Sequence, residues 1–238
     1  MKNLLLKLSA FIYPVTCSCC GKDISAVSKR RVCASCKNDL KLIEGLICQK
    51  CGLPLYDGGE HCYTCRKHPK EFYFDKMRSA YAYKGYIRKL ILKFKYSDRM
   101  FLAGELAEGM ISVMRNNVFF NEADIIVPVP LSIVRSIKRG YNQAELLANE
   151  ISEKISKPVV KNALVRKKIT KPQFKLSKQE RFDNIKDSFA VKNKDLIKNK
   201  NILLVDDIAT TSATASACTK ALKAAGSGKV YVITLARD

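Results

Sequence analysis

The sequence predicts an α/β protein, with a parallel sheet flanked by helices and a small cysteine-rich module before it. Two observations predict this class. Four C-x-x-C pairs lie within the first 65 residues. Beyond Pro69, short apolar runs alternate with segments of helical periodicity, a pattern typical of a parallel sheet. We therefore divide the chain into an N-terminal helix over 1–14, a cysteine-rich module over 15–68 and an α/β domain over 69–238.

The α/β domain is expected to contain five strands and four helices. Apolar residues at i, i+3, i+4 and i+7 predict a helix from Ile87 to Phe94, and Asn142 with Glu145 resembles a capping box. The strands are expected in KMRSAYAYKG (76–85), ADIIVPVP (123–130), KPVVKNAL (157–164), NILLVDD (201–207) and KVYVITLA (229–236). The helices are expected over 87–94, 101–115, 141–155 and 212–225.

The composition points to a basic, non-spanning protein. The 43 Lys and Arg against 22 Asp and Glu give a net charge of +21, which favours polyanionic partners or, as the alternative, a generally lysine-rich surface. Lys7 interrupts the apolar N-terminal run and Pro14 closes it, so we expect neither a membrane span nor a signal peptide. We expect a cytoplasmic protein.

The cysteine pairs predict thiolate zinc sites. In a reducing compartment, stacked C-x-x-C pairs indicate metal ligation rather than disulfides, and two pairs complete a tetrahedral S₄ site suited to Zn²⁺. Four thiolates leave no open position, so the zinc is expected to be structural. Sequential pairing gives two ribbons; a crossed pairing, a single zinc, or His61 and His68 as ligands stay open. The expected ligands are Cys17, Cys20, Cys33, Cys36, Cys48, Cys51, Cys62 and Cys65.

A candidate ligand site follows the apolar run ILLV at 202–205. Asp206 and Asp207 come directly after this strand, and a turn rich in hydroxyl groups leads into the next helix. Ligands of parallel sheets bind beyond the carboxyl ends of the strands, and a helix start offers backbone N–H groups to an anion. Carboxylates bind vicinal hydroxyls or a divalent cation. A molecule with a phosphate, a cis-diol and Mg²⁺, such as phosphoribosyl pyrophosphate (PRPP), satisfies these features together.

The segment ILLVDDIATTSAT resembles the PRPP-binding motif of type I phosphoribosyltransferases. The resemblance implies a phosphoribosyltransferase-like sheet in which Asp206 and Asp207 contact the ribose of PRPP and act in catalysis. It assigns the 5′-phosphate loop to Ala209, Thr210, Thr211, Ser212, Ala213 and Thr214. The chain departs from the family at Ser212, where glycine is usual, which puts catalytic turnover in doubt more than PRPP binding.

Nearly the whole chain resembles the ComF (ComFC) competence family. The matching blocks, behind the C-x-x-C pairs, are YKGYIRKLILKFKY, IIVPVPLSIVRSIKRGYNQAELLA, LVRKKITKPQFKLSKQERFDNIKDSF and the PRPP motif. The resemblance implies PRPP bound with Mg²⁺, a role in the uptake or handling of transforming single-stranded DNA, and a helicase-like partner. Phosphoribosyltransferase turnover is an open question, and a salvage phosphoribosyltransferase with no DNA role is the alternative. No feature identifies the acceptor or the oligomeric state.

Basic residues supply candidate anion sites. Arg135 and Arg139 follow the strand that ends at Pro128–Pro130, where they are expected to contact pyrophosphate, since arginine suits bidentate phosphate contact. Arg88, Lys89, Lys93 and Lys95 form a candidate single-strand DNA surface with nearby aromatic residues. The basic segment 161–200 is expected to close over PRPP, with a basic linker as the alternative.

Overall fold

The architecture was analysed in a computed structural model, which describes residues 15–25, 30–56, 58–96, 99–167, 185 and 187–238. The helix expected over 1–14 and residues 168–184 and 186 of the expected closing segment lie outside these residues. The described helices are α2 (Ala34–Asn38), α3 (Tyr63–Lys67), α4 (Gly85–Tyr96), α5 (Leu102–Arg115), α6 (Ile133–Arg139), α7 (Gln143–Ile155) and α9 (Ala213–Ala224), with 3₁₀ turns η1 (Pro69–Glu71) and η2 (Val118–Glu122). The strands are β1 (Lys76–Ala82), β2 (Ile125–Pro128), β3 (Leu164–Arg166), β4 (Phe189–Val191), β5 (Ile202–Ala209) and β6 (Val230–Arg237).

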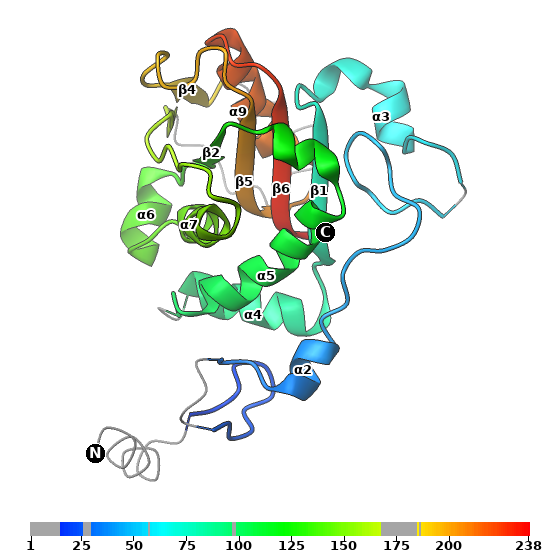
Figure 1. Ribbon diagram of the computed structural model, residues 1–238, viewed down its shortest axis with the longest axis vertical. Coiled ribbons are helices and arrows are strands. Elements are labelled where there is room, and N and C mark those ends of the chain that lie inside the picture. The colour runs from blue at the N-terminus through cyan, green and yellow to red at the C-terminus, as the bar shows by residue number, and fades with distance from the viewer. Residues whose placement is uncertain (1–14, 26–29, 57, 97–98, 168–184, 186) are drawn as a thin grey trace.

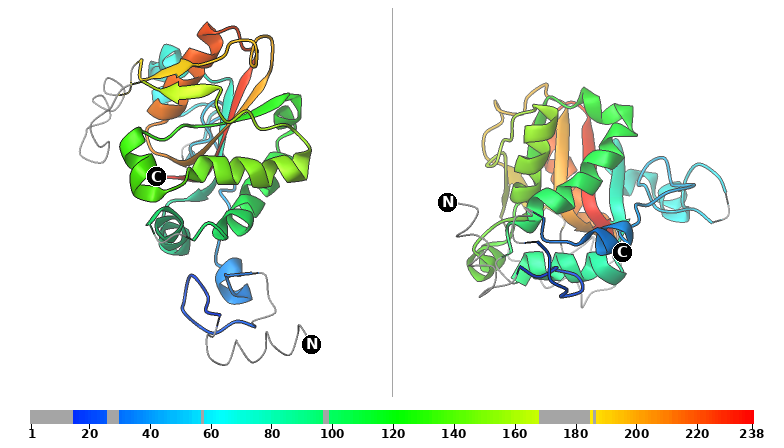
Figure 2. Two further views of the ribbon diagram at one scale, coloured as in Figure 1. Left: turned by 90° about the vertical axis from the view of Figure 1, so that its left-hand side faces the viewer. Right: turned by 60° about the horizontal axis from the view of Figure 1, so that its bottom comes forward.

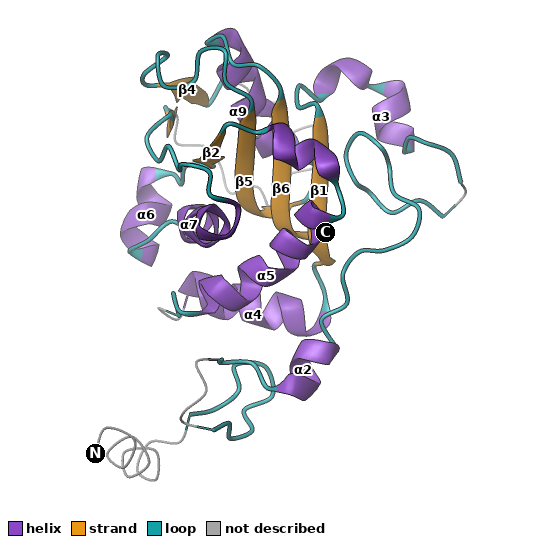
Figure 3. Ribbon diagram, viewed as in Figure 1, coloured by secondary structure: helices purple, strands orange, loops and turns teal. Residues whose placement is uncertain are grey.

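The main sheet is parallel, as predicted, in the order β1-β6-β5-β2 (Figure 1). Helices α5 and α7 cover one face and α9 lies on the other (Figure 3). The side chains of β5 alternate between two cores: Leu203 and Val205 join the α5/α7 side, whereas Ile202 and Leu204 join the α9 side. Burial on both faces explains the uninterrupted apolar run.

The predicted helices are confirmed with small shifts of their ends. In α4 the buried residues are Ile87, Leu90, Ile91 and Phe94, the four that the periodicity selected. The Asn142 side chain caps α7 by accepting from the N–H of Ala144. Glu145 does not complete a capping box, because its carboxylate pairs with the Lys161 ammonium at 2.9 Å.

The strand predicted over 157–164 is wrong in extent. Val159 makes a single parallel bridge to Ile126, and Pro158 supplies no backbone N–H for a longer ladder. The chain becomes a strand only at Leu164, where β3 pairs antiparallel with β4 in a separate two-stranded sheet. This hairpin packs near α9 and was not predicted.

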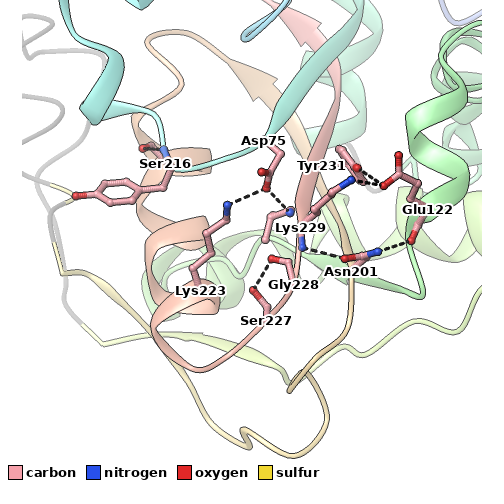
Figure 4. Close-up of polar contacts among 11 residues, drawn as sticks. Asp75, Glu122, Asn201, Ser216, Lys223, Ser227, Gly228, Lys229 and Tyr231 are labelled. Atoms are coloured by element: carbon pink, nitrogen blue, oxygen red, sulfur yellow. Dashed lines mark hydrogen bonds and ion pairs between the residues drawn. The ribbon is translucent and has the colours of Figure 1, made fainter.

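Polar contacts fasten the amino ends of the parallel strands (Figure 4). Asp75 accepts from the N–H of Val230 at 2.8 Å and pairs with Lys223 at 2.9 Å. Glu122 accepts from Lys229 and from the Tyr231 hydroxyl, each at 2.7 Å. These contacts tie α9 and η2 to the start of β6, leaving the carboxyl ends of the strands at the opposite edge for ligands.

Within the described part of the chain, every helix falls short of the length and apolarity that crossing a bilayer requires.

Candidate functional site

The eight predicted ligand cysteines form two groups, in sequential pairing. Cys17, Cys20, Cys33 and Cys36 make the first cluster, and Cys48, Cys51, Cys62 and Cys65 make the second. Within each cluster the Sγ atoms lie within 4.8 Å of one another. Neither predicted alternative histidine joins them, and His68 Nδ1 lies 3.2 Å from a Glu71 carboxylate oxygen.

The sulfur geometry fits zinc. A tetrahedron with Zn–S bonds of about 2.3 Å has S···S edges of about 3.8 Å. The Sγ atoms of Cys20 and Cys33 are 3.8 Å apart, and those of Cys51 and Cys62 are 3.7 Å apart. Both distances match the edge of a closed four-sulfur zinc site.

The two clusters are attached to different parts of the domain (Figure 2). The first lies below α4, where the Lys93 ammonium donates to the Ser18 carbonyl at 2.7 Å. The second lies beside β1, where the N–H of Met77 donates to the Lys50 carbonyl at 2.9 Å. A Cβ on Gly52, which has φ +70°, would lie 2.7 Å from the Met77 carbonyl oxygen, so this close approach requires glycine.

We expect zinc to leave the first cluster before the second. Cys20 is exposed and Cys33 half-buried, whereas all four cysteines of the second cluster are buried. A chromogenic chelator should therefore release zinc in a fast and a slow phase. The variant Cys20→Ser should remove the fast phase and keep the slow one; loss of the slow phase instead would contradict this order.

The predicted acids lie near the carboxyl end of β5, which continues two residues beyond them. Asp206 and the loop residues 209–214 line one cavity together with Ile208, Ala215 and Thr234. The loop leads into α9, whose first turn starts at Ser212 in a left-handed conformation, φ 63°. The structure thus brings the predicted acid and the predicted phosphate loop to a single concave site.

The two acids are in different electrostatic states. Burial raises the pKa of Asp206 to about 7, and the charge of Asp207 adds to this effect. The Asp207 carboxylate instead pairs with the Lys95 ammonium at 2.8 Å, with both side chains about 14% and 13% exposed. At neutral pH the Asp206 carboxyl is therefore close to its titration midpoint.

Two arginines, Arg135 and Arg166, interact electrostatically with Asp206. The charge of Arg135, on α6, favours the ionised form of Asp206 and so works to lower its pKa against burial. Arg166, on β3, has a lowered pKa caused mainly by burial and then by Arg135. Arg139 is turned elsewhere: it donates to Gln143 at 2.9 Å and to the Tyr96 hydroxyl at 3.2 Å. Of the two predicted pyrophosphate ligands, Arg135 is the one that electrostatics links to the acids.

The four candidate DNA-binding residues of α4 do not form one surface. Arg88 and Lys89 are exposed, and the Lys89 ammonium lies 5.4 Å from the centre of the Tyr86 ring. Lys93 contacts the first cluster through Ser18, and Lys95 contacts Asp207. Lys95, which the sequence analysis assigned to the DNA surface, pairs with Asp207, and helical periodicity does not show which segments pack against a polar face.

Arg237 is a second residue at the site that the sequence analysis missed. It stands opposite Ala209 in the register of β5 and β6 and is 7% exposed. Its guanidinium donates to the Ser212 hydroxyl at 3.3 Å and to the Cys51 carbonyl at 2.5 Å. The sequence signal that could have identified Arg237 is a basic residue at the end of a largely apolar strand.

Comparison with known proteins identifies the cysteine-rich part of the chain and the family. Residues 8–66 match the family model "Double zinc ribbon domain". The chain is 31% identical over 215 residues to "Competence protein F" of Haemophilus influenzae, covering 89% of this chain and 92% of the relative. This protein belongs to the competence protein F (ComF) family.

Other ComF relatives extend the comparison. "Competence protein ComFC" of Bacillus subtilis is 30% identical, covering 77% of this chain and 74% of its own length. "DNA utilization protein YhgH" of Escherichia coli K12 is 26% identical, with 94% and 97% covered. Among solved structures, the glutamine PRPP amidotransferase of B. subtilis matches 60% of this chain and 30% of its own at 17% identity, with a TM-score of 0.39. The ComF assignment rests on the sequence matches.

Proposed function

We propose that this ComF-family protein binds PRPP together with Mg²⁺ at the carboxyl edge of β5 and takes part in handling single-stranded DNA. The proposal of PRPP binding rests on one observation, which is that Asp206 and the loop 209–214 line the same cavity. Backbone N–H groups and hydroxyls at the start of α9 suit a 5′-phosphate, and the adjacent carboxylates suit the ribose hydroxyls. Arg135, beside Asp206, would meet the pyrophosphate.

Ser212 is compatible with a phosphate in this loop. Its hydroxyl is turned toward Arg237, on the β6 side, and the side chain is buried. The hydroxyl that distinguishes it from the usual glycine is therefore hydrogen-bonded to the protein, although Ser212 also lines the cavity. This orientation supports PRPP binding with serine at this position.

Removing the charge of Asp207 should weaken PRPP binding. Hydrogen bonds to charged groups contribute about 1.5–3 kcal/mol, so we expect Asp207→Asn to reduce affinity for PRPP roughly 10- to 100-fold in MgCl₂. Titration calorimetry measures this. The exposed Asp195→Asn is the matched control and should bind like the wild type. Since Asp207→Asn also breaks the ion pair with Lys95, Lys95→Met is measured in parallel. No heat with the zinc-loaded wild type would refute the proposed site.

The proposed role in handling DNA rests on three observations. The chain has a net positive charge, the beginning of α4 is exposed, and relatives are named for competence and DNA utilization. We expect Arg88→Glu with Lys89→Glu to weaken binding of a labelled single-stranded oligonucleotide and to lower the dependence of its affinity on salt. Fluorescence anisotropy at several salt concentrations measures both. The pair Lys194→Glu with Lys198→Glu, exposed before β5, controls for net charge. Equal weakening by both pairs would contradict a specific surface on α4.

The alternative is a salvage phosphoribosyltransferase without a DNA role. It predicts pyrophosphate release from PRPP with a nucleobase acceptor and no oligonucleotide binding at moderate salt. Turnover of PRPP with retained oligonucleotide binding would join the two functions in one protein. A helicase-like partner is part of the proposed competence role and would be tested by binding assays with the DNA-loaded protein.

A further inference from the structure

One side chain joins the second cysteine cluster to the phosphate loop. The Arg237 guanidinium donates through one terminal nitrogen to the Cys51 carbonyl at 2.5 Å. Its other terminal nitrogen lies 3.8 Å from Cys51 Sγ and donates to the Ser212 hydroxyl at 3.3 Å. A cysteine of the second cluster and the residue directly before α9 are therefore held by the same planar group.

The contact depends on the charge of the Arg237 guanidinium and on the chemistry of the second cysteine cluster. Arg237 is buried, and a buried charge is stable only beside compensating charge and hydrogen bonds. With Zn²⁺ bound, four thiolates would carry a net charge of −2 close to the guanidinium, whose terminal nitrogen lies 3.8 Å from Cys51 Sγ. An arginine fork can reach sulfur, carbonyl and hydroxyl at once, which a lysine ammonium cannot do in the same plane.

The backbone conformation of the loop at Ser212 depends on this contact. A non-glycine residue at φ 63° is held in a left-handed conformation only where its surroundings compensate the strain. The hydrogen bond from Arg237 is such a compensation, and glycine at this position would offer no hydroxyl to accept it. The conformation that starts α9 therefore depends on an arginine that the second cysteine cluster holds in place.

We infer that Arg237 is a positioning residue that couples the second zinc site to the phosphate loop, so that metal in the one and PRPP in the other stabilise each other. The ligand named here rests on the proposed function. Coupling between two sites is reciprocal: PRPP must tighten zinc by the factor by which zinc tightens PRPP.

The test measures zinc release from the full-length, zinc-loaded protein with a chromogenic chelator, with and without PRPP and MgCl₂. We expect PRPP to lower the rate of zinc release in the slow phase, which comes from the second cluster, about fivefold or more. The fast phase, from the first cluster, should not change, and it reports any direct effect of PRPP on zinc. Ser212→Ala, which deletes only the loop end of the contact, should abolish the slowing while leaving the zinc content at two per chain.

Arg78 provides the matched control for the arginine itself. It is 5% exposed and donates to the Gln49 and Met77 carbonyls at 3.2 and 2.8 Å, beside the same cluster, but no contact joins it to the loop. Arg237→Met should lose the slowing by PRPP, and Arg78→Met should retain it. Equal behaviour of the two variants, or slowing that survives in Ser212→Ala, would overturn the coupling.

Hydrogen exchange distinguishes a failure of PRPP binding from a failure of the coupling through Arg237. If the wild type binds no PRPP, hydrogen exchange of residues 209–214 still tests the contact. Exchange there should be faster in Arg237→Met and in Ser212→Ala than in the zinc-loaded wild type and in Arg78→Met. Unchanged exchange in both loop-linked variants would refute the positioning role whatever the ligand.

Discussion

Cys51→Ser should release the second zinc and unfold much of the α/β domain. Structural zinc sites contribute about 10–16 kcal/mol of apparent binding free energy in small ribbons, more than the total stability of most domains. The cysteines of the second cluster belong to the same buried core as Met77, Leu204 and Val232. We therefore expect loss of both the metal and the cooperative unfolding transition, measured by metal analysis and thermal unfolding.

Cys20→Ser is the matched control for this variant. It removes one thiolate from the first cluster, where the replaced side chain is exposed, and the core beneath α4 retains Leu90, Phe94 and Leu106. We expect it to lose one zinc per chain and to keep a cooperative transition at a lower temperature. Equal loss of folding in the two variants would show that the sheet depends on both clusters alike.

Asp206→Asn should stabilise the free protein, and increasingly so as the pH rises. On folding, the pKa of this carboxyl rises from 3.8 to about 7 because of burial and the charge of Asp207. The folded state therefore binds the proton more tightly, so the stability that the group contributes is full below about pH 4 and is lost up to about pH 7. Each pKa unit corresponds to about 1.36 kcal/mol, so the gain at pH 8 should be on the order of a few kcal/mol.

Urea unfolding of the zinc-loaded protein between pH 5.5 and 8 measures this effect. The difference in free energy of unfolding between Asp206→Asn and the wild type should grow over this range and level off above about pH 7. Asp195→Asn, an exposed position, should show a difference that does not vary with pH. A constant difference for Asp206→Asn would mean that the carboxyl is already ionised throughout. The stability lost by the wild type would be the cost of keeping an acid at the proposed ligand site.

Much of the fold could be predicted because its signals are local. The strands β5 and β6 each begin with an uninterrupted apolar run, at 202–205 and 230–233, since both faces of the sheet are covered there. The spacing of the cysteine pairs predicted the ligands, and the structure chose between the pairings that the sequence left open. Asp206 and the loop after it could be placed together because a parallel strand delivers both to the same edge.

What could not be predicted depends on contacts between distant segments. The β3–β4 hairpin joins residues separated by a long basic stretch, and three-residue strands have too little periodicity to detect. Lys95 appears in the sequence as one of several lysines on a polar helix face, yet it pairs with Asp207. Arg237 reaches Ser212 only because the register of β5 and β6 sets it opposite Ala209.

The position of β6 in the sheet bears on how the protein folds as it is synthesised. In the main sheet β1 pairs with β6 alone, although β6 is the last strand in chain order. Pairings between distant segments raise the contact order and slow folding. A nascent chain can gather its cysteines around metal early, but β1 has no partner strand in the main sheet until β6 has been made. We therefore expect the newly made protein to spend its most aggregation-prone period with its metal sites assembled and its sheet still open.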